Sequence, residues 1–206
     1  MRHVDLSGKR LTMEDAVVLG AAVVLSPTVV SVSVTAGVTL PVGKLLRLGK
    51  SGPPDLTQLQ LGALEAALLG RILMRCRNIT HLALASNELG AAGVGELAHS
   101  LVPDETVGCG MLTSLELGDN ALCGKRLDEA GSLVGQWDAS GVQVLAKAAK
   151  ESSSLSFLTL SDNVLDAPAM TMMAEALTPD DDNKFSNLNG LVMQRMQVRP
   201  TMPCLC

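Results

Sequence analysis

The chain has 206 residues, of which 47% are hydrophobic, and this apolar content excludes intrinsic disorder. Its formal net charge of −5 is unevenly spread: residues 1–78 carry nine Lys/Arg against five Asp/Glu (net +4), and residues 79–206 carry seven against sixteen (net −9). Because the acidic half repels phosphate backbones, we expect no nucleic-acid partner and favour a protein partner with a basic surface.

Residues 1–78 show weak patterns of alternating strands and helices. The expected elements are a strand and turn over 4–11, a helix over 16–25, a strand over 29–34, an irregular segment over 40–54, a strand over 56–61 and a helix over 64–73. The uncharged stretch 16–43 leaves a membrane span as an alternative, but Pro27 interrupts it and a spanning helix needs about 20 predominantly apolar residues. We therefore expect no membrane segment, and it stays open whether 29–55 forms a repeat unit.

A repeated phrase dominates the rest of the chain. Residues 79–89 (ITHLALASNEL), 112–122 (LTSLELGDNAL) and 155–165 (LSFLTLSDNVL) share the pattern L-x-x-L-x-L-x-x-N-x-L. Leucines two apart face the same side of a strand, and the residues between them face the other side. An Asn recurs at the same place in each phrase (Asn87, Asn120, Asn163). We predict that it has a structural role, in which its side chain forms hydrogen bonds with backbone groups of the turn. Apolar residues at helical spacing follow each phrase, so each unit reads as strand, turn and helix.

Such units stack, because none can bury its strand and its helix alone. They begin at Ile79, Leu112, Leu155 and Leu188, which are 33, 43 and 33 residues apart. Extra residues are expected at 102–111 and 178–187, between a helix and the next strand, and at 123–140, between the Asn turn and its helix. These insertions are predicted to lie at the edges of the stack and to leave its core intact.

Over residues 79–198 the phrase resembles that of the ribonuclease-inhibitor-like leucine-rich repeat proteins. The resemblance implies an α/β fold: a curved, horseshoe-shaped leucine-rich-repeat solenoid with a parallel sheet on the concave face and helices on the convex face. Residues 1–78 are then divergent units of the same solenoid domain, and 199–206 form a tail. An incomplete fragment of a longer array remains an alternative.

The candidate binding residues are polar or aromatic and are expected on the concave strand face. They are His81, Ser114, Glu116, Asp119, Phe157, Thr159, Asp162 and Gln194. Glu116, Asp119 and Asp162 are predicted to form an acidic cluster for a basic partner. Phe157 is predicted to be the aromatic anchor, because such residues carry much of the affinity of interfaces.

No catalytic constellation can be recognised. His3, His81 and His99 have no Cys, Asp or Glu at ligand or triad spacing, and the five cysteines have no zinc or disulfide pattern. We predict a cytoplasmic, non-catalytic protein–protein interaction module without a cofactor or metal. By fold analogy alone, a regulator of a small GTPase is the alternative. The partner's identity, the oligomeric state and the role of Cys204 and Cys206 stay open.

Overall fold

The computed structural model describes residues 2–46, 55–76, 79–102, 111–176, 178 and 187–194. The elements in chain order are β1 (Arg2–Asp5), α1 (Met13–Val24), β2 (Val29–Ser33), α2 (Val42–Leu46), α3 (Ala63–Leu73), β3 (His81–Ala83), α4 (Gly90–Ala98), the 3-10 helix η1 (His99–Leu101), β4 (Ser114–Glu116), β5 (Lys125–Leu127), β6 (Leu133–Gly135), α5 (Ser140–Glu151), β7 (Phe157–Thr159), α6 (Ala167–Glu175) and β8 (Gly190–Val192). Most of the predicted insertions 102–111 and 178–187, and the predicted tail 199–206, lie outside the described residues.

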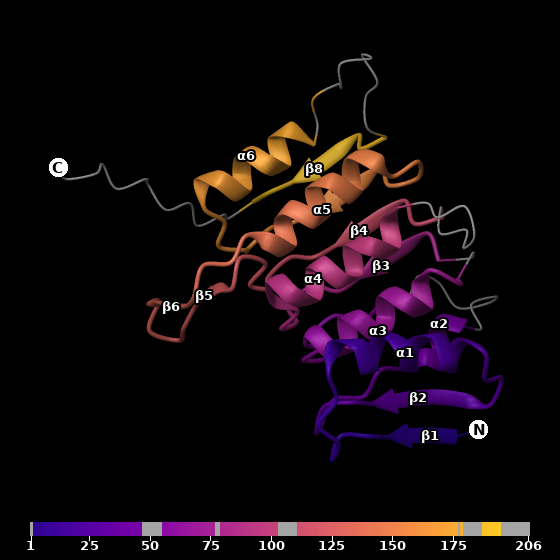
Figure 1. Cartoon of the computed structure of the whole chain (residues 1–206). Coiled ribbons are helices and arrows are strands. Elements are labelled where there is room, and N and C mark those ends of the chain that lie inside the picture. The colour runs from indigo at the N-terminus through magenta and orange to yellow at the C-terminus, as the bar shows by residue number, and fades with distance from the viewer. Residues whose placement is uncertain are drawn as a thin grey trace.

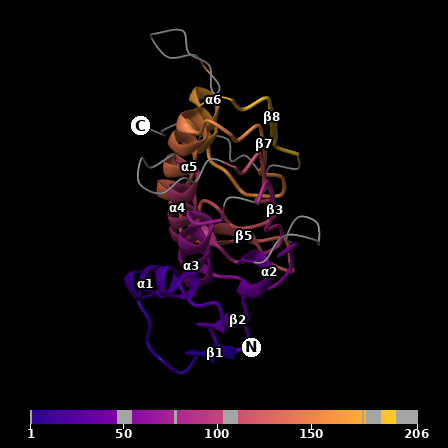
Figure 2. The same cartoon turned by 90° about the vertical axis from the view of Figure 1, so that its right-hand side faces the viewer.

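The elements form two layers, with helices on one side and strands on the other (Figures 1 and 2). Strands β3, β4, β7 and β8 pair in that order, and every pair is parallel. In the helix layer α1 packs on α3, α3 on α4, α4 on α5, and α5 on α6. Because successive strands and successive helices are neighbours in space, the fold is of the leucine-rich-repeat type expected from residues 79–198.

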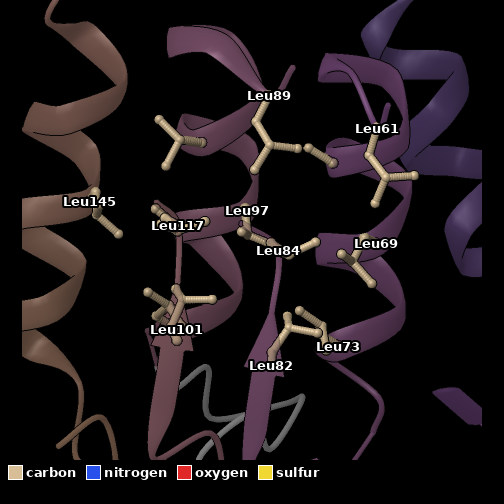
Figure 3. Packing of buried hydrophobic residues seen from close by; sticks show 14 of the residues in the cluster. Leu61, Leu69, Leu73, Leu82, Leu84, Leu89, Leu97, Leu101, Leu117 and Leu145 are labelled. Atoms are coloured by element: carbon tan, nitrogen blue, oxygen red, sulfur yellow. The ribbon is translucent and has the colours of Figure 1, made fainter. Parts of the chain in front are cut away.

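The core is aliphatic, as the composition predicts. Leu82 and Leu84 follow the alternation of the first phrase, and both are buried against helix leucines such as Leu97 (Figure 3). Leu115 and Leu117 repeat this arrangement one unit later. Full burial of a leucine side chain contributes about 1.5–3 kcal/mol, so the repeated leucines hold the strand and helix layers together.

Helix starts are set by local side chains. Thr12 Oγ1 accepts a hydrogen bond from the Asp15 N–H (3.2 Å), and an Asp15 carboxylate oxygen accepts from the Thr12 N–H (2.9 Å), so the two form a capping box for α1. The hydrogen bonds that the Asp15 carboxylate accepts from the Thr12 N–H and from the Thr12 hydroxyl lower the pKa of this carboxyl. Asp166 caps α6 by accepting from the Ala169 N–H at 2.8 Å.

The N-terminal part differs from the expected uniform array. Strands β1 and β2 form a parallel pair that is separate from the four-stranded sheet. Val32 of β2 also makes an antiparallel bridge with Leu40, so its second edge pairs with the chain that follows it rather than with the main sheet. The main sheet is extended at this end by a single parallel bridge between Asp55 and Ala83.

Two expectations for this region need correction. Residues 56–61 were expected to form a strand, but beyond the Asp55 bridge the backbone turns, with Gln58 and Gln60 at φ +58° and +56°. Left-handed backbone of this kind does not continue a strand. Within the predicted irregular segment 40–54, Val42–Leu46 forms helix α2, and residues 47–54 lie outside the described residues. Among the helices of the described residues, none is both long and apolar enough to cross a bilayer.

The insertion 123–140 contains an antiparallel hairpin, β5–β6, which the sequence pattern did not predict. It projects from the body at the end of the molecule where the turns after the strands lie (Figure 1). Asp128 Oδ1 accepts hydrogen bonds from the N–H groups of Ala130 and Ser132, which closes the hairpin loop, and Gly131 adopts φ +75° there. At the base, the Asp138 N–H donates to the Cys123 carbonyl (3.0 Å).

Candidate functional site

Two rows of side chains cross the solvent side of the main sheet. The register pairs His81 with Ser114, Ser114 with Phe157, and Phe157 with Gly190. The second row runs from Ala83 through Glu116 and Thr159 to Val192. We call this surface the strand face, and its side chains are those of His81, Ala83, Ser114, Glu116, Phe157, Thr159 and Val192. The leucines between the two rows, Leu82, Leu115 and Leu158, are buried on the opposite side.

Phe157 is the large apolar group at the centre of this surface. Its side chain is 54% exposed although neighbouring Leu158 is fully buried. The ring lies against Gly190 of the adjacent strand, where a Cβ would come within 2.6 Å of Phe157 Cδ1. The absence of a side chain at Gly190 therefore leaves room for the ring on the sheet.

The three residues of the predicted acidic cluster belong to two kinds of element rather than to strands alone. Glu116 is exposed on the strand face, whereas Asp119 and Asp162 lie beyond the strands, in the turns. Their φ values are +52° and +61°, and Ser86 at the equivalent place has φ +53°. Backbone hydrogen bonds from Ser86 N–H to the Gly118 carbonyl and from Asp119 N–H to the Ser161 carbonyl hold these turns in register. Ser86, Asp119 and Asp162 thus form one row along the turn edge. Gln194, also exposed, lies after β8, where its carbonyl accepts from the Asp162 N–H.

Behind this edge, the buried asparagines join one turn to the next. Asn87 Oδ1 accepts from the N–H groups of Leu59 and Leu61 in the preceding unit (both 3.0 Å), and its Nδ2 donates to Leu84. Asn163 Oδ1 likewise accepts from the Asn120 N–H at 2.9 Å. Asn120 Nδ2 donates to the Leu84 carbonyl at 2.8 Å, but its Oδ1 has no hydrogen-bond partner among the described residues.

A groove of about 1650 Å³ separates the turn edge from the hairpin. Its lining includes the turn row Ser86, Asp119 and Asp162 and, from the hairpin, Lys125–Glu129 with Val134 and Gly135. Arg126 of the hairpin pairs with Glu88 of the first phrase at 3.6 Å. We call this space the hairpin groove. Sequence reasoning missed it because residues from five separated segments of the chain line it.

A second hollow lies in the helix layer. It measures about 680 Å³ and is lined mainly by residues of α5, together with His99, Met172 and Glu175 from neighbouring segments.

His81 contacts Thr80 through its ring (Nδ1 to Oγ1, 2.9 Å), and His3 contacts Ser31 (2.8 Å). Across the described part of the chain, no three His, Cys, Asp or Glu side chains are grouped closely enough to hold a metal ion.

Comparisons with known proteins agree with the repeat. Residues 75–98, which contain β3, the Asn87 turn and α4, match the family model described as Leucine Rich repeat. No curated protein shows a significant match to the chain. This match is confined to one strand, turn and helix of the chain, and it agrees with the leucine-rich-repeat type of fold seen in the structure.

Two solved structures resemble the chain at low sequence identity. The tropomodulin C-terminal domain of Caenorhabditis elegans is 15% identical, and the match covers 86% of this chain and 82% of that one with a TM-score of 0.44. A structure described as Leiomodin-1 Actin-Binding Site 2 is 16% identical, with 85% and 78% covered and a TM-score of 0.43. Likenesses of this strength support no functional assignment.

Proposed function

We propose that this chain is a non-catalytic protein-interaction module that binds a protein partner through the strand face. In the finer description, it is a ribonuclease-inhibitor-like solenoid whose sheet lines the concave side. The observation that carries the proposal is the exposure of Phe157 on the strand face, where the side chains of paired strands lie in rows and most of the others are polar. Exposing an aromatic ring to water is unfavourable, and interfaces concentrate their affinity in such residues.

The surroundings of Phe157 suit a partner contact. Ser114 and Thr159 provide half-buried hydroxyls beside the ring, and Glu116 adds a carboxylate one strand away. These groups surround an apolar centre with polar side chains, an arrangement in which the rim fixes orientation and the centre supplies affinity. The carboxylate favours a partner with a basic surface, because opposite charges across an interface accelerate association.

The test is quantitative affinity capture with wild type, Phe157→Ala and a matched control, Val18→Ala. Val18 is 69% exposed on α1, away from the strand face, so the control removes a comparable exposed apolar side chain. A hot-spot aromatic contributes at least about 2 kcal/mol, so the Phe157 variant is expected to retain a direct partner about 30-fold less tightly.

Both variants must first match wild type in circular dichroism and urea unfolding. Candidates lost with Phe157→Ala and kept with Val18→Ala are then tested as purified proteins by titration. Equal capture by both variants would contradict binding through the strand face.

A further inference from the structure

We propose that the hairpin groove is a second interaction surface, which binds an extended basic segment of a protein partner. The proposal rests on the proposed function in one respect, that the partner is a protein with a basic surface. It places the main electrostatic contact in the hairpin groove rather than on the strand face. The charge balance, the shape and the apolar lining of the groove suit such a segment.

The charge of the lining is strongly negative. Five carboxylates and two cations line the groove, which gives a net charge of −3. Both cations already have partners, since Arg126 pairs with Glu88 and Lys125 Nζ donates to the Gly135 carbonyl. Asp119 belongs to the turn row and Glu129 to the hairpin, and both are exposed. A hollow surface lined by one sign of charge concentrates the opposite sign.

The carboxylates are spread rather than gathered. In the described residues they do not form a group of three that could hold one metal ion, so the negative charge suits several separated cations instead. Neighbouring strands are about 4.8 Å apart, so the row from Ser86 to Asp162 spans about 10 Å, the length of about three residues of extended chain. Alternate side chains of such a segment point in opposite directions, so a segment with several cations can reach carboxylates of both the turn row and the hairpin.

The groove also offers apolar contact. Val134 and Leu127 on the hairpin are partly exposed, and Val164 contributes from the turn after Asn163. The long methylene stems of Lys and Arg pack on such surfaces while their charged ends reach carboxylates. A basic segment therefore satisfies both features of the lining, whereas an acidic or purely apolar segment satisfies at most one.

The test measures binding of a fluorescein-labelled oligolysine peptide by anisotropy at low ionic strength. The groove variant is Asp119→Asn/Glu129→Gln, and the matched control is Glu14→Gln/Glu175→Gln on the helix layer. Each double variant removes two negative charges. In the described residues none of these four side chains makes a hydrogen bond or ion pair, so folding should be preserved. Phe157→Ala serves as the strand-face variant.

Wild type should bind the peptide, with affinity falling as salt is raised, and the groove variant should bind about three- to tenfold more weakly. The control and Phe157→Ala should bind like wild type. Three results would overturn the proposal: absence of binding at low ionic strength, equal weakening in the groove and control variants, or Mg²⁺ displacing the peptide far better than NaCl of equal ionic strength. Weakening by Phe157→Ala alone would also overturn it while leaving the strand-face function intact.

Discussion

Gly190 and Phe157 are coupled across neighbouring strands: a Cβ at Gly190 would lie 2.6 Å from Phe157 Cδ1 and 2.9 Å from Cε1. Gly190→Ala should therefore push the ring from its place, at a cost of about 0.5–1.5 kcal/mol for an off-rotamer side chain. In a Phe157→Ala background the same change should be neutral or stabilising, because alanine restricts the unfolded chain. Urea unfolding of the four proteins gives the coupling energy directly, and a coupling near zero would contradict the contact.

Asn163 should be more costly to remove than Asn120. Asn163 Oδ1 accepts from the Asn120 N–H, and its Nδ2 donates to the carbonyls of Leu117 and Leu160, all at 2.9 Å. Asn163→Ala removes the partner of each of these three buried groups, at about 1–3 kcal/mol each, so we expect a total loss of about 3 kcal/mol or more. Asn120→Ala should cost less, because the Asn120 Oδ1 has no partner to lose within the described residues.

The measurement for this pair is denaturant unfolding, with Asp119→Asn as the control. Asp119 is the exposed neighbour of Asn120, so its variant should stay close to wild type in stability. An Asn120→Ala variant that unfolds more easily than Asn163→Ala would contradict the ordering.

Two glycines on facing helices should respond to alanine with opposite signs. A Cβ at Gly141 would clash with the backbone oxygen of Ala91 and lie 2.5 Å from Val94 Cγ1, so Gly141→Ala should destabilise by about 1–3 kcal/mol. A Cβ at Gly95 would have its nearest neighbour at 3.7 Å, and Gly95→Ala within α4 should stabilise by about 0.5–1 kcal/mol. Thermal unfolding of both variants checks the signs, and destabilisation of equal size would contradict the packing of α4 on α5.

Cys123 should make stability depend on pH in the alkaline range. Burial raises the pKa of this thiol to about 11 from its ordinary 9.0, with a smaller contribution from the nearby Asp166 carboxylate. The unfolded thiol loses its proton first as pH rises through 9, so the unfolded state is favoured progressively until the folded thiol ionises near 11. The stability present below pH 9 should fall by at most about 2.7 kcal/mol across this window.

Cys123→Ala should remove that part of the alkaline loss. Urea midpoints of wild type and variant between pH 8 and about 11 provide the comparison. Parallel pH profiles would show that Cys123 does not contribute.

The parts of the structure that could be predicted depend on residues close together in the sequence, and the parts that could not depend on contacts between distant residues. The strands over 81–83, 114–116 and 157–159 and the helices behind them follow from leucine spacing within each phrase. The hairpin was missed because its two short strands lie outside the repeated phrase, which is what reveals the equally short strands of the main sheet. Strand β2 is bridged to Leu40 through Val32 and is not part of the main sheet. The sequence pattern allowed pairing with the main sheet equally well, so this choice could not be predicted.

The candidate site shows the same division. The exposure of Phe157 and Glu116 to solvent could be predicted from strand alternation alone, because each is next in sequence to a buried leucine. The position of Asp119 and Asp162 in turns, beyond the strands, could not be predicted from strand alternation. Their left-handed backbone ends the alternation of the strand before them. The hairpin groove depends on how the 123–140 insertion folds back toward Glu88, which is a tertiary contact.

The hydrogen bond from the Asp138 N–H to the Cys123 carbonyl has a consequence for how this protein could change over evolutionary time. The chain leaves the repeat and returns to it at almost the same point, so the helix layer is insensitive to what lies between. A different segment could replace the hairpin there without any adjustment of the leucine core. Changes of this inserted segment could then alter the partner that is bound, while the rest of the fold stays the same.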